Sequence, residues 1–181
     1  MIEDRLLIWK FKRGSTGALC RIYEKYKDDL LRLASALLND TAAAEDIVHD
    51  CFINLAQSSQ RLKVGGNLKS YLATSVANRA RNWNRAKQRC ATTALNEAGP
   101  IVSSLKRPEQ WIIYNEQLRQ LNNAFTQLPY EQREIIILHL QGEMKFEEIA
   151  ELQAVSINTV QSRYRYGLDR LRSILDSEVK L

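Results

Sequence analysis

The sequence predicts an all-helical protein made of two small domains. Apolar residues recur with a period of 3.6 residues over most of the chain, and no useful stretch alternates with a period of two. A stretch without periodicity, residues 90–108, contains Gly99 and Pro100 and is expected to be a flexible linker. The expected domains are therefore residues 1–89 and residues 109–181.

The N-terminal domain is expected to contain three helices. The first follows Gly14 with Ser15 as its N-cap, and the second follows the capping oxygens of residues 39–41. The third runs from about residue 68 to residue 89. Trp83 lies in phase with the apolar side of that third helix, which favours a core position over base stacking.

Helical patterns resume after Pro108. One helix is expected over residues 109–127, and the next begins at Pro129 and ends before Gly142. A short helix over residues 146–152, a three-residue turn and a long helix from Ser156 then predict a helix-turn-helix. The expected inward stripe of the last helix is Ile157, Val160, Tyr164, Leu168, Leu171 and Leu175.

Composition narrows the function classes. The chain has 181 residues, a net charge of +5 and three cysteines, which are far apart and lack metal spacing. No apolar run exceeds four residues, so membrane insertion and a signal peptide are not expected. We expect a cytoplasmic protein without metal or cofactor, and an enzyme is the least favoured class because no side-chain set has catalytic spacing.

The charged residues form separate blocks. Residues 61–96 contain eight basic residues and no acidic one, and residues 152–172 contain four arginines and one aspartate. The intervening residues 109–151 carry eight acids against three bases. Two basic blocks suit a polyanion such as nucleic acid, although solvated helix faces explain the same charge equally well.

The outward face of the last helix is the first candidate site. Its side chains are mostly hydrogen-bonding, and its arginines suit guanine edges and phosphates. A structural helix pair is less favoured, because this face carries no acid before Asp169. The candidates for DNA contact are Asn158, Thr159, Gln161, Ser162, Arg163, Arg165 and Tyr166.

A basic loop over residues 61–69 and one side of the third helix form the second candidate. The glycines of the loop let main-chain N–H groups approach a base or a phosphate closely. The candidate nucleic-acid contacts are Arg61, Lys63, Asn67, Asn78, Arg81, Asn82 and Arg85.

The second helix carries the third candidate. Opposite its buried stripe lie Asp46, His49, Asp50 and Ile53. Acids around an outward isoleucine are typical of a protein-docking patch, although a single exposed isoleucine is also ordinary. No further ligand accompanies these residues, so a metal site is not expected.

Together these features resemble the extracytoplasmic-function (ECF) sigma factors of bacterial RNA polymerase. The first half of the resemblance spans about residues 15–89 and rests on AEDIVHDCFINL and YLATSVANRARNWNR. The second half spans about residues 109–175 and rests on LPYEQREIIILHL, EEIA and NTVQSRYRYGLDRLR. Three departures bear on the structure: Ala154 replaces a common glycine, Gln153 a common apolar residue and Gly167 a common alanine.

The resemblance implies a non-enzymatic initiation factor whose partners are core RNA polymerase and promoter DNA. The helix with Asp46, His49, Asp50 and Ile53 would dock on the clamp helices of the largest subunit. The basic loop and the third helix would hold the melted minus-ten strand, and the helix-turn-helix would bind the minus-thirty-five duplex. An anti-sigma protein that packs between the two domains is a further candidate partner.

Two other functions compete with this interpretation. A free-standing helix-turn-helix regulator would bind duplex DNA as a dimer, but the sequence has no obvious dimerising heptad. An adaptor would direct the basic faces to acidic proteins instead of DNA.

Overall fold

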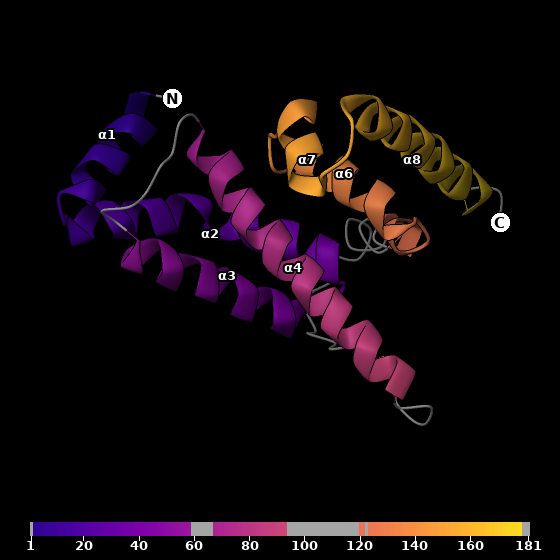
Figure 1. Ribbon diagram of the computed structural model, residues 1–181, viewed down its shortest axis with the longest axis horizontal. Helices are drawn as coiled ribbons and strands as arrows, with labels where there is room; N and C mark the ends of the chain where they lie inside the picture. Colours follow the sequence, from indigo (N-terminus) through magenta and orange to yellow (C-terminus); the bar gives the residue numbers. More distant parts are fainter. Residues whose placement is uncertain (1, 59–66, 94–119, 122, 179–181) are drawn as a thin grey trace, which may run out of the picture.

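The computed structural model describes residues 2–58, 67–93, 120–121 and 123–178 (Figure 1), and every regular element in these ranges is a helix. The predicted all-helical fold is confirmed. The helices are α1 (Ile2–Lys12), α2 (Thr16–Leu38), α3 (Thr41–Gln57), α4 (Leu68–Thr93), α6 (Tyr130–Leu140), α7 (Phe146–Gln153) and α8 (Ile157–Glu178). Residues 120, 121 and 123–126 are helical as well, whereas residues 94–119 lie outside the described part of the chain.

Three helices, α2, α3 and α8, begin directly after their predicted capping residues. Ser15, Asp40 and Ser156 each accept a hydrogen bond from the backbone N–H three residues further on, at 3.3, 3.1 and 3.1 Å. Each such bond satisfies a donor that the first helical turn leaves unpaired and contributes about 1 kcal/mol. The third predicted helix, α4, continues to Thr93, four residues beyond its expected end.

Helix α1 was not expected from the sequence. Its eleven residues bury only one short cluster (Leu7, Ile8 and Phe11), which is too little for a clear helical period. Polar contacts hold it to α2: Asp4 accepts hydrogen bonds from Lys25 Nζ and Tyr26 Oη, both at 2.8 Å. Burial alone would raise the pKa of Asp4, but these hydrogen bonds and the Lys25 charge outweigh it and lower that pKa.

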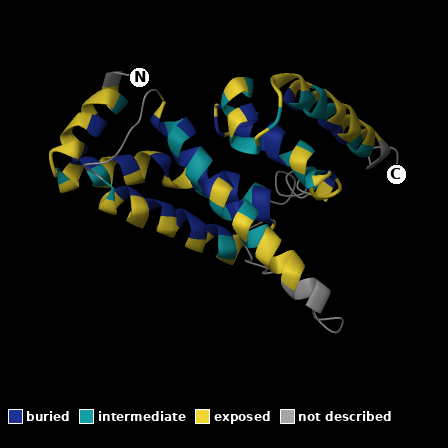
Figure 2. Ribbon diagram, viewed as in Figure 1, coloured by how far each residue is buried: buried dark blue, intermediate teal, exposed yellow. Residues whose placement is uncertain are grey.

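The two groups of helices share one hydrophobic core. Buried side chains of α1–α4 form one cluster with Ile135, Leu138 and Met144 of the C-terminal group. Figure 2 shows buried residues in both groups of helices. A smaller cluster between α6 and α8 contains Ile136 and Leu171. The two expected domains therefore pack against each other, an arrangement that the sequence did not predict. We call this contact the seam.

Two glycines allow close helix packing. A Cβ atom on Gly167 would lie 2.9 Å from Ile136 Cδ1, which explains why α8 has a glycine in mid-helix where it meets α6. A Cβ atom on Gly142 would lie 2.6 Å from the carbonyl oxygen of Leu138 and 3.2 Å from Ala73 Cβ, so this position brings the chain directly against α4.

Two apolar residues test the predicted helix phases. Trp83 is partly buried against the core, as its phase predicted, and the ammonium of Lys87 lies 4.6 Å from the centroid of its ring. The prediction that Ile157 is buried is wrong, because this side chain is 40% exposed. The core starts one turn later, at the fully buried Val160, so the first turn of α8 projects beyond it.

The turn of the helix-turn-helix contains a strained residue. Ala154 has φ +54° and ψ 44°, the left-handed conformation that a Cβ atom disfavours by about 1–2 kcal/mol. Glycine, which has no Cβ atom, adopts this conformation without that penalty.

We predict that Ala154→Gly raises the free energy of unfolding by about 0.5–1 kcal/mol, since relief of the strain exceeds the added freedom of the unfolded chain. The matched control is Ala150→Gly, in the buried interior of α7. This control should lower stability by about 1 kcal/mol or more. Urea unfolding of both variants measures the two signs, and a loss of stability in Ala154→Gly would contradict the explanation.

Candidate nucleic-acid interface

The outward face of α8 is open to solvent. Asn158, Gln161, Arg165 and Tyr166 are exposed, and Tyr166 retains 67% of its accessible surface. The other three candidates on this helix, Thr159, Ser162 and Arg163, are half-buried. Four of the seven predicted side chains thus lie free on the second helix of the helix-turn-helix, where a partner can reach them (Figure 2).

The packing of α7 against α8 fixes that face. Ile149 and Ala150 of α7 are buried, as is Val160 of α8, and Val155 N donates to the Ala150 carbonyl at 3.1 Å. The small Ala150 side chain lets the two helices cross closely. The arrangement is therefore a helix-turn-helix, as the sequence predicted.

Helix α4 carries the second candidate set. Asn78, Asn82 and Arg85 are exposed. Asn67 is exposed as well, and its Oδ1 accepts a hydrogen bond from Lys69 N at 3.0 Å at the start of the helix. Arg61 and Lys63 lie outside the described residues.

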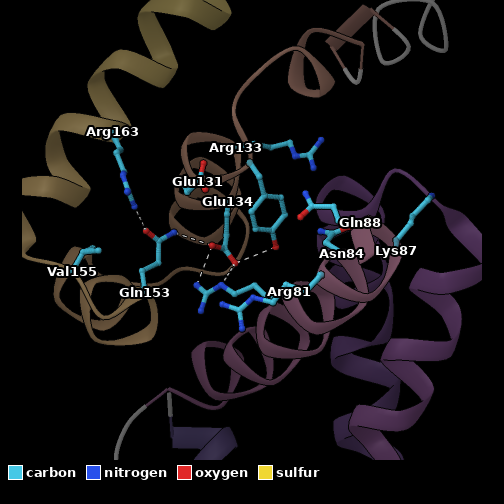
Figure 3. A pocket seen from close by; sticks show the side chains of 12 residues that line it. Arg81, Asn84, Lys87, Gln88, Glu131, Arg133, Glu134, Gln153, Val155 and Arg163 are labelled. Carbon is cyan, nitrogen blue, oxygen red and sulfur yellow. Dashed lines mark hydrogen bonds and ion pairs between the residues drawn. The ribbon is translucent and has the colours of Figure 1, made fainter. Parts of the chain in front are cut away.

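Arg81 differs from its neighbours on α4 because it is an internal residue of the seam. Its Nε and Nη2 donate to the two carboxylate oxygens of Glu134, at 2.8 and 3.0 Å (Figure 3). Its Nη1 donates to the Leu152 carbonyl at 2.7 Å. The Glu134 side chain keeps only 2% of its accessible surface and that of Arg81 15%. This bidentate pair connects α4 to α6, and its contacts are polar.

Further hydrogen bonds extend from Glu134. Gln153 donates from Nε2 to Glu134 at 2.8 Å and accepts from Arg163 Nη1 at 3.1 Å, while Tyr130 Oη donates to Glu134 at 3.3 Å (Figure 3). Burial, and then the nearby Glu134 charge, raise the pKa of Tyr130, so its hydroxyl stays protonated. We call these five side chains the Glu134 network: Arg81, Tyr130, Glu134, Gln153 and Arg163.

The seam also contains contacts away from this network. Lys69 Nζ lies 2.7 Å from Glu143 and 3.1 Å from Asp29. Burial lowers the pKa of Lys69, but the hydrogen bonds to both carboxylates outweigh burial, and the net shift is upward. Arg133 Nη2 donates to the Leu37 carbonyl at 3.1 Å. The Glu134 network itself lines a crevice of about 680 Å³ between α4 and the C-terminal helices, together with Arg85 and Arg133.

Helix α3 presents the third candidate set on its outer side. Asp46, His49 and Asp50 are exposed, and Ile53 retains 40% of its accessible surface. The opposite side of the helix is buried in the core. Asp50 pairs with Arg79 of α4 at 3.0 Å, and Asp46 and His49 also line a groove of about 440 Å³ between α2 and α3.

Sequence patterns missed three members of the Glu134 network: Tyr130, Glu134 and Gln153. Glu134 precedes the apolar run of residues 135–138, and an acid in phase with such a run is a signal for a buried, paired carboxylate. The sequence gives no comparable signal for Gln153, whose amide bridges Glu134 and Arg163.

Neither a metal centre nor a membrane span is found among the described residues. No three histidine, cysteine or acidic side chains there are grouped to hold a metal ion. No helix within those ranges is long and apolar enough to cross a bilayer.

The fold and these faces define a helical DNA-binding protein with a helix-turn-helix module. The model of Sigma-70 region 2 matches residues 22–90, and the model of Sigma-70, region 4 matches residues 118–171. The chain belongs to the ECF group of the sigma-70 family of RNA polymerase sigma factors. It directs RNA polymerase to promoters through regions 2 and 4, and it is not an enzyme.

Several known proteins are similar over nearly the whole chain. The ECF RNA polymerase sigma factor SigW of Bacillus subtilis (strain 168) is 25% identical, covering 97% of both chains. The ECF RNA polymerase sigma-E factor of Escherichia coli (strain K12) is 24% identical, covering 99% of this chain and 95% of that protein.

Solved structures have the same fold. CnrH, solved in complex with the cytosolic domain of CnrY, has a TM-score of 0.69 at 18% identity. The match covers 97% of this chain and 98% of the CnrH chain. The sigma factor RpoE of Bartonella quintana, in complex with the anti-sigma factor NepR, has a TM-score of 0.65 at 23% identity. That match covers 86% of this chain and 97% of RpoE.

We predict that Glu134→Gln lowers the free energy of unfolding by about 2–4 kcal/mol, because Arg81 keeps its charge in the seam without a counter-charge. The double variant Arg81→Met with Glu134→Leu should recover most of this loss. Urea unfolding gives the energies, and X-ray scattering should show a larger radius of gyration for Glu134→Gln.

The matched control for this prediction is Glu131→Gln, an exposed carboxylate one turn earlier on α6. Its effect on stability should stay within about 0.5 kcal/mol. Equal effects of the two glutamine variants would show that the buried pair does not hold the seam.

Proposed function

We propose that the three exposed faces divide the work of promoter recognition. The outer side of α3 docks on the clamp helices of the largest polymerase subunit. Helix α4 and the preceding basic loop hold the non-template strand of the minus-ten element, and α8 binds the minus-thirty-five duplex. The supporting observation is that each face presents candidate side chains to solvent on a helix whose other side is buried.

The outer side of α8 has the chemistry of a recognition helix. The second helix of a helix-turn-helix lies in the major groove with its N-terminal part against base edges. Asn158, Gln161 and Arg165 are exposed within the first three turns, and such amides and guanidinium groups pair with adenine and guanine edges. The free N–H groups of the first turn of a helix also favour a nearby phosphate.

Helix α4 suits a single strand. Asn78, Asn82 and Arg85 are exposed and span about 10 Å along the helix axis. Amides can hydrogen-bond to unpaired bases, and an arginine can neutralise a phosphate, which offsets part of the free energy of unstacking.

The seam limits when these faces can act together. Two of the proposed DNA contacts, Arg81 and Arg163, are engaged in the Glu134 network. Arg81 can neutralise a phosphate only after its two bonds to Glu134 break. Arg163 bonds through one N–H group to the neutral amide of Gln153, and DNA would have to compete with that amide for its position. We therefore propose that the closed arrangement belongs to the free factor and that docking on polymerase separates regions 2 and 4.

An anti-sigma protein is a further proposed partner. The structurally similar CnrH and RpoE were solved in complex with the cytosolic domain of CnrY and with the anti-sigma factor NepR. The proposal for this chain rests on that likeness, and co-purification with core polymerase in the presence and absence of candidate proteins would test it.

The experiment that tests the main proposal is reconstitution with core polymerase. The chain should co-migrate with the core enzyme and direct transcripts from a two-element promoter. Absence of both would refute the proposed division of surfaces.

For region 4 we predict that Arg165→Ala weakens discrimination among minus-thirty-five variants by about 1–3 kcal/mol, since a bidentate base contact is lost. The control is Arg172→Ala, an exposed arginine two turns further along α8. It should weaken all sequences equally or not at all. Competition binding by holoenzyme measures both, and unchanged discrimination in Arg165→Ala would remove this residue from base recognition.

For region 2 we predict that Asp46→Lys together with Ile53→Asp abolishes docking on core polymerase. The first change reverses a charge and the second puts a carboxylate into an apolar contact. Both side chains are exposed, so circular dichroism should show unchanged helical content. Retained docking, measured by co-migration, would move the interface to another surface.

A further inference from the structure

Helix α1 exposes an aromatic and basic surface that none of the proposed contacts uses. Leu6 and Trp9 each retain 50% of their accessible surface, and their spacing of three residues puts them on the same side of the helix as one apolar patch. The cations around them are exposed as well. We call this surface the α1 face, and it consists of Arg5, Leu6, Trp9, Lys10, Lys12 and Arg13.

The α1 face is a well-anchored surface. At about 100° per residue, Trp9 lies at the centre of the outward side of the helix, and Leu7, Ile8 and Phe11 lie on the inward side. The inward side is buried in the core. Asp4 holds the helix to Lys25 and Tyr26 of α2. The exposure of Trp9 therefore does not come from a helix that lacks packing.

The charge of the α1 face has one sign. Its charged residues are four cations, and both acids of the helix, Glu3 and Asp4, are paired with Lys25 at 2.8 Å. The Arg13 guanidinium lies 3.9 Å from the centroid of the Trp9 ring, which restricts the ring and adds a second flat group to the surface.

An aromatic ring among exposed cations matches the chemistry of single-stranded nucleic acid. Such strands bind through bases stacked on aromatic rings and phosphates neutralised by Lys and Arg. A membrane surface fits less well, because the broad apolar side of α1 is used up in the core and leaves only Leu6 and Trp9 outside. The acidic α3 face, in contrast, lacks this chemistry.

The position of α1 indicates which part of a promoter it would meet. Helix α1 is packed on α2, so its place within region 2 does not depend on where region 4 lies. Figure 1 shows α1 at the end of region 2 where α4 begins. If the upstream bases of the minus-ten strand lie along α4 and its downstream bases reach the basic loop before α4, the strand continues past the α1 end of region 2. This step rests on the proposed function.

We infer that the α1 face binds the single-stranded non-template DNA immediately downstream of the minus-ten element, with a base stacked on Trp9. The four cations hold the adjoining phosphates. The seam does not cover this surface, so it is available in the closed arrangement too.

The test uses holoenzyme and two oligonucleotide probes from a promoter that it transcribes. Both contain the minus-ten element; one non-template strand ends there, and the other continues for about eight nucleotides. The extension should strengthen binding of the wild-type holoenzyme. Trp9→Ala should remove roughly 5-fold or more of that gain, in line with the loss of one stacked base, whereas Trp9→Phe should keep most of it.

Two comparisons make the test specific. Leu140→Ala shortens an apolar side chain that is 59% exposed on α6, and it should leave the gain unchanged. Lys10→Ala should reduce the salt dependence of binding to the long probe only, by about one phosphate contact. Circular dichroism should show the same helical content in every variant.

The outcomes are distinguishable. An equal gain in wild type and Trp9→Ala would overturn this inference while leaving the minus-ten proposal intact. Loss of core polymerase affinity in Trp9→Ala would identify a protein contact and also overturn it. Failure of the wild-type holoenzyme to bind even the short probe would refute the proposed function, and this inference with it. A photoreactive residue at position 9 should crosslink to downstream bases of the extended strand.

Discussion

A carboxylate that is almost completely buried sets the arrangement of this molecule. Glu134 lies in a helix whose next four residues are all in the core, so its charge has no access to bulk water. An unpaired charge in such a place is destabilising by several kcal/mol, and only a close cation with further hydrogen bonds compensates for it. Arg81 supplies that cation from the other domain, and Tyr130 and Gln153 supply the remaining hydrogen bonds. The relative position of the two domains follows from this requirement.

The same requirement connects packing with function. A guanidinium that chelates Glu134 cannot also neutralise a phosphate, and Gln153 links Arg163 to the same carboxylate. A carboxylate is planar and a phosphate is tetrahedral, but each can accept two parallel hydrogen bonds from one arginine guanidinium. In the seam, Arg81 of region 2 therefore binds the Glu134 carboxylate in place of a DNA phosphate. The α3 and α1 faces lie outside this competition, because neither contributes to the Glu134 network.

Sequence periodicity predicted the features that depend on one helix at a time. The caps at Ser15 and Asp40, the buried side of α3 and the helix-turn-helix all follow from local spacing. The partner of Arg81 could not be predicted, because helix phase gives the side on which a residue lies and not the element that covers it. Ile157 was assigned correctly to a phase but lies beyond the end of the covering helices. Helix α1 was missed because its role is only clear from its contacts with α2.

The shared core also has a consequence during protein synthesis. Ala73 and Thr74 of α4 contact Gly142 and Met144, which are translated about 70 residues later. At roughly 5–20 residues per second, the ribosome needs on the order of 3–15 s to deliver the covering segment. During that interval the nascent N-terminal helices expose an apolar surface to solvent, and Arg81 does not yet have Glu134 as its partner. Chaperones and nucleic acid can therefore bind the nascent chain before its C-terminal helices pack against the N-terminal ones.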